Sequence, residues 1–259
     1  MLESLFAGAV ADAASRQELV SLPEIEKLAS NAKPALNSAD LLGSGNFIKV
    51  IAEIKRASPS KGHLATIADP AGLGRVYESA GASAISVLTE RRSFHGSLDD
   101  LDAVRSAVSV PILRKDFIAN EYQVLEARAH GADIVLLIAA GLEPGLLMRL
   151  KSLIESLGMT AFIETHNKIE VEFAAYISSK LVGVNARDLT TFETDRGLFE
   201  ELVDLLPFDC IKVAESAVRG VDDVRAYAAA GADCVLVGEA LVTGDYESLV
   251  AEFSRIAKV

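Results

Sequence analysis

Short apolar runs recur along the chain at intervals of about 20 to 35 residues, the spacing of successive βα units. None of the runs alternates strictly between apolar and polar residues, which is typical of strands covered on both faces, as in parallel sheets. The pattern therefore predicts eight strands, at Ile48–Ile54, Ala84–Thr89, Val110–Leu113, Asp133–Ile138, Thr160–Glu164, Leu181–Asn185, Cys210–Glu215 and Asp233–Val237.

Turn and cap residues mark the predicted helix ends. Three segments share a sequence pattern in which a predicted helix ends at a glycine before the next strand: ESAGASAISVL at 78–88, ARAHGADIVLLI at 127–138 and YAAAGADCVLVG at 227–238. Glycine takes the left-handed conformation of a helix C-cap without a Cβ penalty. Asp69 before Pro70 predicts a helix start, and Asn120 followed by Gln123 resembles a capping box.

Eight strands, each followed by a helix and without a Pro/Ser/Gly-rich linker, predict a single closed (βα)8 TIM barrel. An open doubly wound sheet is the alternative, but it usually has fewer strands, and the chain has no G-x-G-x-x-G turn. Residues 1–45 precede the first strand and contain two helical stretches, at about 2–20 and 23–29. We expect 1–45 to be an N-terminal helical extension packed on a catalytic barrel domain at 46–259.

The composition limits which binding partners and which cellular compartment we expect. The chain has 259 residues and a formal net charge of −12, which disfavours nucleic acid or an anionic membrane as the main partner. Cys210 and Cys234 lie in apolar runs, and no Cys/His spacing suggests a zinc site or a disulfide framework. The N-terminus lacks a basic leader, and the longest apolar run, 134–142, is too short to span a membrane. We expect a cytoplasmic protein that is a monomer or a weak homo-oligomer.

Charged and polar side chains follow the apolar part of most predicted strands. In a barrel the carboxyl ends of the strands meet at one mouth, where the active sites of this fold lie. A single charge there is usually a solvated loop residue, but five strand ends together indicate acid–base chemistry. The residues are Glu53, Lys55 and Arg56; Arg114, Lys115 and Asp116; Glu164; Asn185 and Arg187; and Glu215 and Ser216.

The same mouth is where such barrels bind phosphate, through backbone N–H groups after the seventh and eighth strands. Residues 216–218 and 238–240 occupy these places. His63, His95 and His166 fall in separate predicted loops, where single histidines are more often surface residues than metal ligands. His130 precedes Gly131 at a helix end, where we expect it to interact with terminal carbonyls. The residues alone predict an acid–base enzyme acting on a phosphorylated small molecule.

Six motifs carry a more specific resemblance. They are IAEIKRASPSKG (51–62), FHGSLDDL (94–101), PILRKDFI (111–118), VGVNARDL (182–189), VAES (213–216) and VLVGEAL (235–241). Together they resemble indole-3-glycerol phosphate synthase, a barrel enzyme of tryptophan biosynthesis, over about residues 46–245. The resemblance implies that 1-(2-carboxyphenylamino)-1-deoxyribulose 5-phosphate is closed to indole-3-glycerol phosphate with loss of carbon dioxide and water, without a cofactor or a metal.

The resemblance also implies residue roles. Lys115 matches the general acid that protonates the substrate ketone, and Glu53 is expected to pair with Lys115 and orient it. Glu164 is expected to act with Lys55 in the proton transfers of dehydration. The expected substrate-binding residues are Ser58, Phe94, Phe117, Asn185, Arg187 and Glu215. The expected phosphate-binding residues are Lys55, Ser216, Ala217, Gly238 and Glu239.

The chain departs from the family pattern at two positions of these motifs. Ala186 stands where the family usually has Asn; its side chain should point away from its neighbours, so we expect little effect. Ala217 stands where the family usually has Gly, and a positive φ there would strain the phosphate loop.

Two other functions compete with this one. A phosphoribosylanthranilate isomerase would need a Cys/Asp pair at the strand ends, but Cys210 and Cys234 come early in their strands. A barrel that only binds a phosphorylated ligand or a protein partner is disfavoured by the joint presence of Glu53, Lys55, Lys115 and Glu164.

Overall fold

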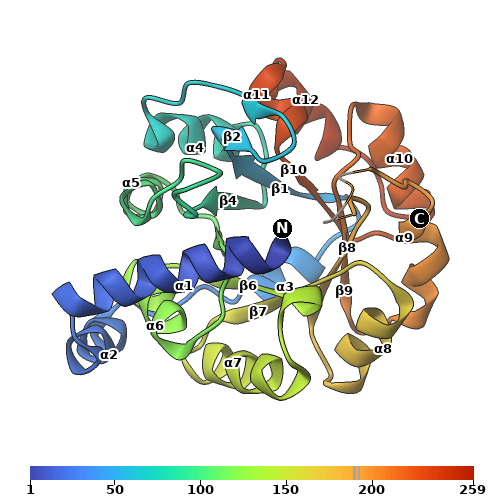
Figure 1. Cartoon of the computed structure of the whole chain (residues 1–259). Helices are drawn as coiled ribbons and strands as arrows, with labels where there is room; N and C mark the ends of the chain where they lie inside the picture. Colours follow the sequence, from blue (N-terminus) through green and yellow to red (C-terminus); the bar gives the residue numbers. More distant parts are fainter. Residues whose placement is uncertain (189–190, 192) are drawn as a thin grey trace.

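Eight parallel strands close into a barrel in the computed structural model, which describes residues 1–188, 191 and 193–259 (Figure 1). Strand β1 pairs with both β4 and β10, which closes the sheet and excludes the open alternative. Leu189, the last residue of the VGVNARDL motif, lies outside the described residues. The barrel strands are β1 (Lys49–Ile54), β4 (Ala84–Leu88), β5 (Ile112–Lys115), β6 (Ile134–Ile138), β7 (Thr160–Thr165), β8 (Leu181–Asn185), β9 (Ile211–Glu215) and β10 (Cys234–Val237).

Helices surround this barrel and cover the outer faces of the strands (Figure 1). Because both faces of each strand are covered, almost every strand residue is buried, which explains the continuous apolar runs. The surrounding elements are α4 (Pro70–Ser79), α5 (Leu98–Ala107), α6 (Glu121–Ala129), η1 (Ala139–Gly141), α7 (Pro144–Ser156), α8 (Lys168–Tyr176), α9 (Leu198–Leu202), η2 (Val203–Leu205), α10 (Val221–Ala229), α11 (Glu239–Thr243) and α12 (Tyr246–Phe253). Within the described residues, no helix has the length and apolar character that a membrane crossing requires.

The predicted strand positions are confirmed to within a residue or two. The largest shift is in β5, which begins at Ile112 and runs to Lys115 instead of covering 110–113. Two charged side chains belong to this strand because alternate positions face opposite sides: Arg114 points outward toward α6 and Lys115 points into the mouth. The apolar run therefore ends before the strand does, because the last two strand residues are charged and are paired on opposite faces.

The predicted turn residues have the expected conformations. The glycines that end α4, α6 and α10 all have positive φ: 107° at Gly81, 81° at Gly131 and 92° at Gly231. The side chain of Asp69 accepts a hydrogen bond from the Gly72 N–H and caps α4.

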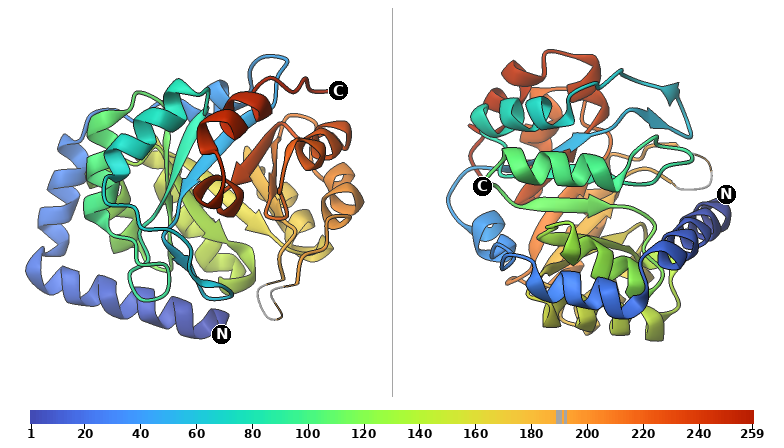
Figure 2. Two further views of the ribbon diagram at one scale, coloured as in Figure 1. Left: turned by 90° about the horizontal axis from the view of Figure 1, so that it is seen from above. Right: turned by 90° about the vertical axis from the view of Figure 1, so that its left-hand side faces the viewer.

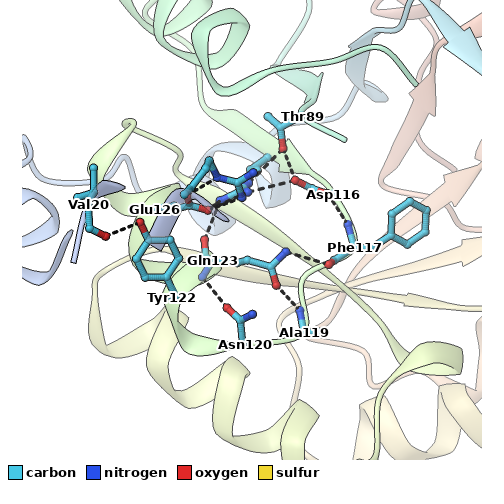
Figure 3. A network of polar contacts seen from close by, with 11 residues as sticks. Val20, Thr89, Asp116, Phe117, Ala119, Asn120, Tyr122, Gln123 and Glu126 are labelled. Atoms are coloured by element: carbon cyan, nitrogen blue, oxygen red, sulfur yellow. Dashed lines mark hydrogen bonds and ion pairs between the residues drawn. The ribbon is translucent and has the colours of Figure 1, made fainter. Parts of the chain in front are cut away.

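The predicted capping box at the start of α6 is only half formed. The Asn120 side chain accepts from the Gln123 N–H, as expected. The Gln123 side chain instead accepts from the Ala119 N–H and donates to the Phe117 carbonyl (Figure 3). It therefore fixes the loop between β5 and α6.

The N-terminal residues form three helices, α1 (Leu2–Leu19), α2 (Leu22–Asn31) and α3 (Ser38–Gly43). Helices α1 and α2 pack on α6, while α3 lies at the opposite end of the barrel from the tip of α1 (Figure 2). A separate small apolar cluster holds them to α6: Ala13, Ile25, Ala29, Tyr122 and Leu125. The helical extension is confirmed; its boundary at residue 45 stays a prediction.

A buried polar network links α1 to strand β5 (Figure 3). Arg16 of α1 donates to Glu126 of α6 over 2.8 Å, and Glu126 also faces the fully buried guanidinium of Arg114 at 3.4 Å. Arg114 in turn pairs with Asp116 at 3.1 Å, and Asp116 accepts from the Phe117 N–H. The network therefore fixes the segment that carries Lys115 and Phe117.

Candidate active site

A cavity of about 660 Å³ lies at the carboxyl ends of the strands. Every predicted site residue lines it: Glu53, Lys55, Ser58, Phe94, Lys115, Phe117, Glu164, Asn185, Arg187, Glu215, Ser216, Ala217, Gly238 and Glu239. Its size suits a small organic ligand. Residues spread over nearly 190 positions of sequence are thus brought to one pocket, as the parallel barrel requires.

The floor of this cavity is a cluster of Lys115 and two carboxyl groups. Lys115 Nζ lies 3.0 Å from Glu164 Oε2 and 3.2 Å from Glu215 Oε2. Both glutamate side chains are only 2% exposed, so a single ammonium group faces two buried carboxyl groups and can compensate the charge of only one of them.

Glu53 belongs to the same layer of the barrel. Together with Lys115, Glu164 and Glu215 it comes from the first, third, fifth and seventh strand around the barrel. Alternate strands of this fold contribute four side chains to each interior layer. Here the uppermost layer is polar, which leaves it available for chemistry.

These groups shift one another's ionisation. Burial opposes the charge on Lys115, yet the carboxylates of Glu164, Glu215 and Glu53 raise its pKa well above the usual range. Burial would also raise the pKa of Glu164, but the Lys115 and His166 cations hold it well below the usual range. Burial and the Glu164 carboxylate together raise the pKa of Glu215 to about 8. The floor therefore holds an ammonium group, a carboxylate and a carboxyl group that is mostly protonated at neutral pH.

The expected direct pair between Glu53 and Lys115 is not formed. Glu53 Oε1 instead lies 2.8 Å from Lys55 Nζ, because both side chains leave β1 on the same face. Gly238 makes room for this pair, since a Cβ there would overlap the Glu53 carboxylate and lie 3.1 Å from Lys55 Nζ. Glu53 acts on Lys115 through its charge and not through a contact.

Asn185 connects the cluster to the loop after β9. Its Nδ2 donates to Glu164 Oε1 over 3.1 Å. Its Oδ1 accepts from the Ser216 hydroxyl over 2.7 Å and from the Arg187 N–H over 3.0 Å. The carboxamide thus fixes the orientation of Glu164 and of both following loops.

The predicted phosphate loop after β9 has left-handed backbone at two consecutive residues. Ser216 has φ of 67° and Ala217 has φ of 58°. Ala217 therefore has the positive φ at which the Cβ of alanine makes the backbone strained. The Glu239 side chain pairs with Lys61 and faces Arg187 at 4.0 Å, so the backbone N–H groups at the start of α11 are the suitable phosphate donors.

The opposite wall of the cavity is apolar and aromatic. Phe117 packs on Phe94 with ring centroids 6.1 Å apart and on Phe6 of α1 at 5.4 Å. Leu2 and Leu5 of α1 also line the cavity. The sequence did not predict these α1 residues, because nothing in a helical N-terminal stretch indicates which strand ends it will cover.

His166 was also missed, and its interpretation as a surface loop residue is wrong. Its side chain is 11% exposed, and its Nε2 lies 3.2 Å from Glu164 Oε1. The spacing carried a signal, since a residue two positions after Glu164 on an extended strand end points to the same face. His130 pairs with Asp102 at 2.8 Å and not with helix carbonyls. Among the residues that the structure describes, no three His, Cys, Asp or Glu side chains are grouped to hold a metal ion.

Both cysteines lie far from this chemistry. Cys234 begins β10 and Cys210 immediately precedes β9, so both are at the end of the barrel opposite the mouth. Burial raises the pKa of the Cys210 thiol to about 12. Neither thiol is placed for the acid–base role that an isomerase of the alternative type would need.

Comparison with known proteins decides the family. Residues 2–253 match the family model described as indole-3-glycerol phosphate synthase. The chain belongs to this family. Its members are lyases that decarboxylate their substrate in tryptophan biosynthesis.

Curated relatives agree with the family model over almost the whole chain. The indole-3-glycerol phosphate synthase of Mycobacterium avium is 55% identical over 253 residues, covering 97% of this chain and 93% of the relative. That of Leifsonia xyli subsp. xyli is 56% identical over 256 residues, covering 99% and 98%.

Two solved structures are similar in fold alone. The N-acetylmannosamine-6-phosphate 2-epimerase of Clostridium perfringens aligns with a TM-score of 0.61 at 17% identity, over 79% of this chain and 90% of the other. The thiamine phosphate pyrophosphorylase of Pyrococcus furiosus aligns with a TM-score of 0.61 at 15% identity, over 84% and 96%.

Proposed function

We propose that the cavity at the barrel mouth is the site where this member of the indole-3-glycerol phosphate synthase family closes 1-(2-carboxyphenylamino)-1-deoxyribulose 5-phosphate to indole-3-glycerol phosphate. The main support for this proposal is the buried cluster in which Lys115 contacts Glu164 and Glu215 on the floor of the cavity. The cluster lies between a loop with phosphate-binding character and an aromatic wall, so both ends of such a substrate find a complementary surface.

The two ends of the substrate fix its orientation. Its phosphate suits the N–H groups of residues 216–217 and 238–239, with the Lys55 ammonium adding charge. Its carboxyphenyl ring suits the wall of Phe94 and Phe117, with Ser58 at the edge and Arg187 and Asn185 toward the carboxylate. The ketone between these ends then faces the floor of the cavity.

Ring closure needs a cation at the oxygen that becomes negative as the aromatic carbon attacks the ketone. Lys115 is ionised under all physiological conditions because its carboxylate neighbours raise its pKa. The charge stabilises the developing alkoxide, and the ammonium donates a proton to it. Loss of carbon dioxide from the quaternary ring carbon then restores the aromatic ring.

Dehydration needs a base for a carbon-bound proton and an acid for the leaving hydroxyl group. Glu164 is the base, because its lowered pKa keeps it ionised. Lys55, paired with Glu53, is the acid. Glu215, mostly protonated at neutral pH, donates a hydrogen bond to a substrate oxygen. Two protons are delivered and one is removed, so each turnover takes up one proton from solvent.

Lys115→Ala tests this assignment. The variant should bind substrate and fold, but its turnover should fall by about 10²–10⁴-fold, measured as indole absorbance with the carboxyphenylamino sugar phosphate. The matched control is Lys151→Ala, which removes a lysine paired with Glu155 on the outer helix α7. Turnover within a few-fold of wild type in Lys115→Ala would remove Lys115 from its role.

The same assay separates the competing functions. If the wild-type protein binds the sugar phosphate but forms no indole, its function is ligand binding and not catalysis. If it converts phosphoribosylanthranilate instead, it is an isomerase. The expected monomer or weak homo-oligomer is tested by sedimentation of the purified chain, and the expected cytoplasmic location by fractionation of the source cells.

A further inference from the structure

We propose that His166 is a positioning residue that, held by Glu170, keeps Glu164 ionised and correctly oriented after Lys115 has given up its proton. This inference rests on the proposed roles of Lys115 and Glu164. It adds to them a second cation on the far side of the catalytic carboxylate.

The carboxylate of Glu164 is held at both oxygens. Oε2 faces Lys115 Nζ at 3.0 Å, while Oε1 faces Asn185 Nδ2 at 3.1 Å and His166 Nε2 at 3.2 Å. His166 approaches without the alignment of a hydrogen bond, since its Nε2 has no hydrogen-bond partner among the described residues. Catalytic contacts that are loose in the free enzyme tighten once substrate is bound. The imidazole is therefore placed to follow Glu164 as that carboxylate turns toward substrate.

Glu170 fixes the other side of the imidazole ring. Asn167 caps α8 by accepting from the Glu170 N–H over 3.0 Å, which places the Glu170 carboxylate at the start of the helix. That carboxylate accepts from the His166 N–H over 2.8 Å and from Asn167 Nδ2 over 2.6 Å, and it faces His166 Nδ1 at 3.3 Å. Glu170 thus holds the backbone N–H and faces Nδ1 of His166, which directs Nε2 toward Glu164.

The charges on all sides of His166 favour the imidazolium form. Glu164 of β7 and Glu170 of α8 face it directly, and Lys115 of β5 and Glu215 of β9 stand beyond Glu164. Burial alone would lower the pKa of His166, but the two adjacent carboxylates raise it to about 10. At neutral pH the array of Lys115, Glu164, His166 and Glu170 is thus electrically balanced.

The reaction disturbs this balance at Lys115. When Lys115 donates its proton to the ketone oxygen, it becomes a neutral amine and no longer compensates Glu164. A buried carboxylate without a cation takes up a proton. His166 then supplies the remaining positive charge, so Glu164 stays a carboxylate and can remove the carbon-bound proton during dehydration.

The experiment compares kcat and KM of wild type, His166→Gln and Glu170→Gln between pH 5 and 9. In His166→Gln we expect the acidic limb of the kcat profile to move toward neutral pH by about one unit or more. This shift corresponds to about a tenfold loss of kcat on the acidic side. KM should change little, because His166 is not among the residues that line the cavity. Glu170→Gln should shift the limb in the same direction by less.

Matched controls separate this role from a structural one. His130→Gln removes a histidine that is also paired with a carboxylate, Asp102, far from the mouth. Glu172→Gln removes a glutamate on the outer face of the same helix α8, paired with Lys168. Neither should move the profile. If His166→Gln does not fold, Glu170→Gln, which keeps the imidazole, carries the test.

Two outcomes overturn the inference: a kcat profile whose acidic limb stays in place, or a loss of kcat that is equal at all pH values. An inactive wild-type protein would instead refute the proposed function. If the wild-type protein is active and Lys115→Ala is not, but His166→Gln has the same pH profile as wild type, only the role of His166 is refuted.

Discussion

Gly238, which directly follows β10, and Glu53 of the neighbouring strand β1 share one small space at the mouth of the barrel. A Cβ on residue 238 would overlap Glu53 Oε1. The φ of Gly238 is negative, at −122°, so the glycine is not there for a left-handed backbone, whereas the space beside Glu53 leaves no room for a Cβ. Its missing side chain lets the Glu53–Lys55 ion pair lie against the loop that we assign to phosphate.

Gly238→Ala should therefore displace the ion pair while leaving the fold intact. We expect kcat/KM to fall by about tenfold or more, which is roughly 1.4 kcal/mol of transition-state stabilisation. Gly145→Ala is the matched control, since a Cβ there meets only Arg149 at 3.8 Å on an exposed helix. Equal steady-state constants in the two variants would contradict the steric role of Gly238.

Ala217→Gly should stabilise the protein, because glycine relieves the positive φ of 58°. Removing such strain is worth about 1 kcal/mol. Urea unfolding measures this, and inhibition by inorganic phosphate should be unchanged or stronger. The control Ala226→Gly, on the exposed face of α10, should lose about 0.5–1 kcal/mol instead. A weaker phosphate site in Ala217→Gly would show that the alanine itself is needed.

Glu126→Gln should uncouple α1 from strand β5. The substitution removes the charge that lies between Arg16 and the fully buried Arg114. Breaking a buried ion pair on one side costs about 3–5 kcal/mol. Chemical unfolding measures the loss, with Glu121→Gln at the exposed start of the same helix as control. A loss below about 1 kcal/mol would show that Asp116 alone compensates Arg114.

Glu215→Gln should change how stability depends on pH. The folded-state pKa of about 8 lies above the ordinary carboxyl value of 4.5, so the folded protein binds this proton more tightly than the unfolded chain does. The favourable contribution is complete below about pH 4.5 and is lost as pH rises toward 8. The variant lacks this loss, so its stability relative to wild type should increase steadily from pH 5 to 8. Unfolding free energies that run parallel in both proteins would refute the raised pKa.

The sequence predicts which residues line the site better than it predicts which of their side chains contact one another. A parallel barrel brings all strand carboxyl ends together, so charged residues at those ends could be gathered before the structure was known. Which partner Lys115 contacts depends on side-chain conformations across the mouth. Strand spacing does not contain this information, and the expected pair with Glu53 was therefore wrong.

Two other misses had a signal in the strand alternation. His166 lies two positions after Glu164 and shares its face, whereas Arg114 lies next to Lys115 and must face outward. Leu2 and Leu5 had no such signal, because their place in the cavity depends on how α1 crosses the barrel. Long-range packing of an extension is not encoded in a local pattern.

The path of α1 along the mouth also has a practical consequence. Residues at the start of α1 border the cavity, whereas residues 256–258 pair with the segment before β1 at the other end of the barrel (Figure 2). A purification tag or a fluorophore joined to Met1 would lie at the entrance of the cavity and obstruct ligand binding. The same label joined after Val259 would leave the entrance clear, which makes that end the correct attachment point for immobilised binding measurements.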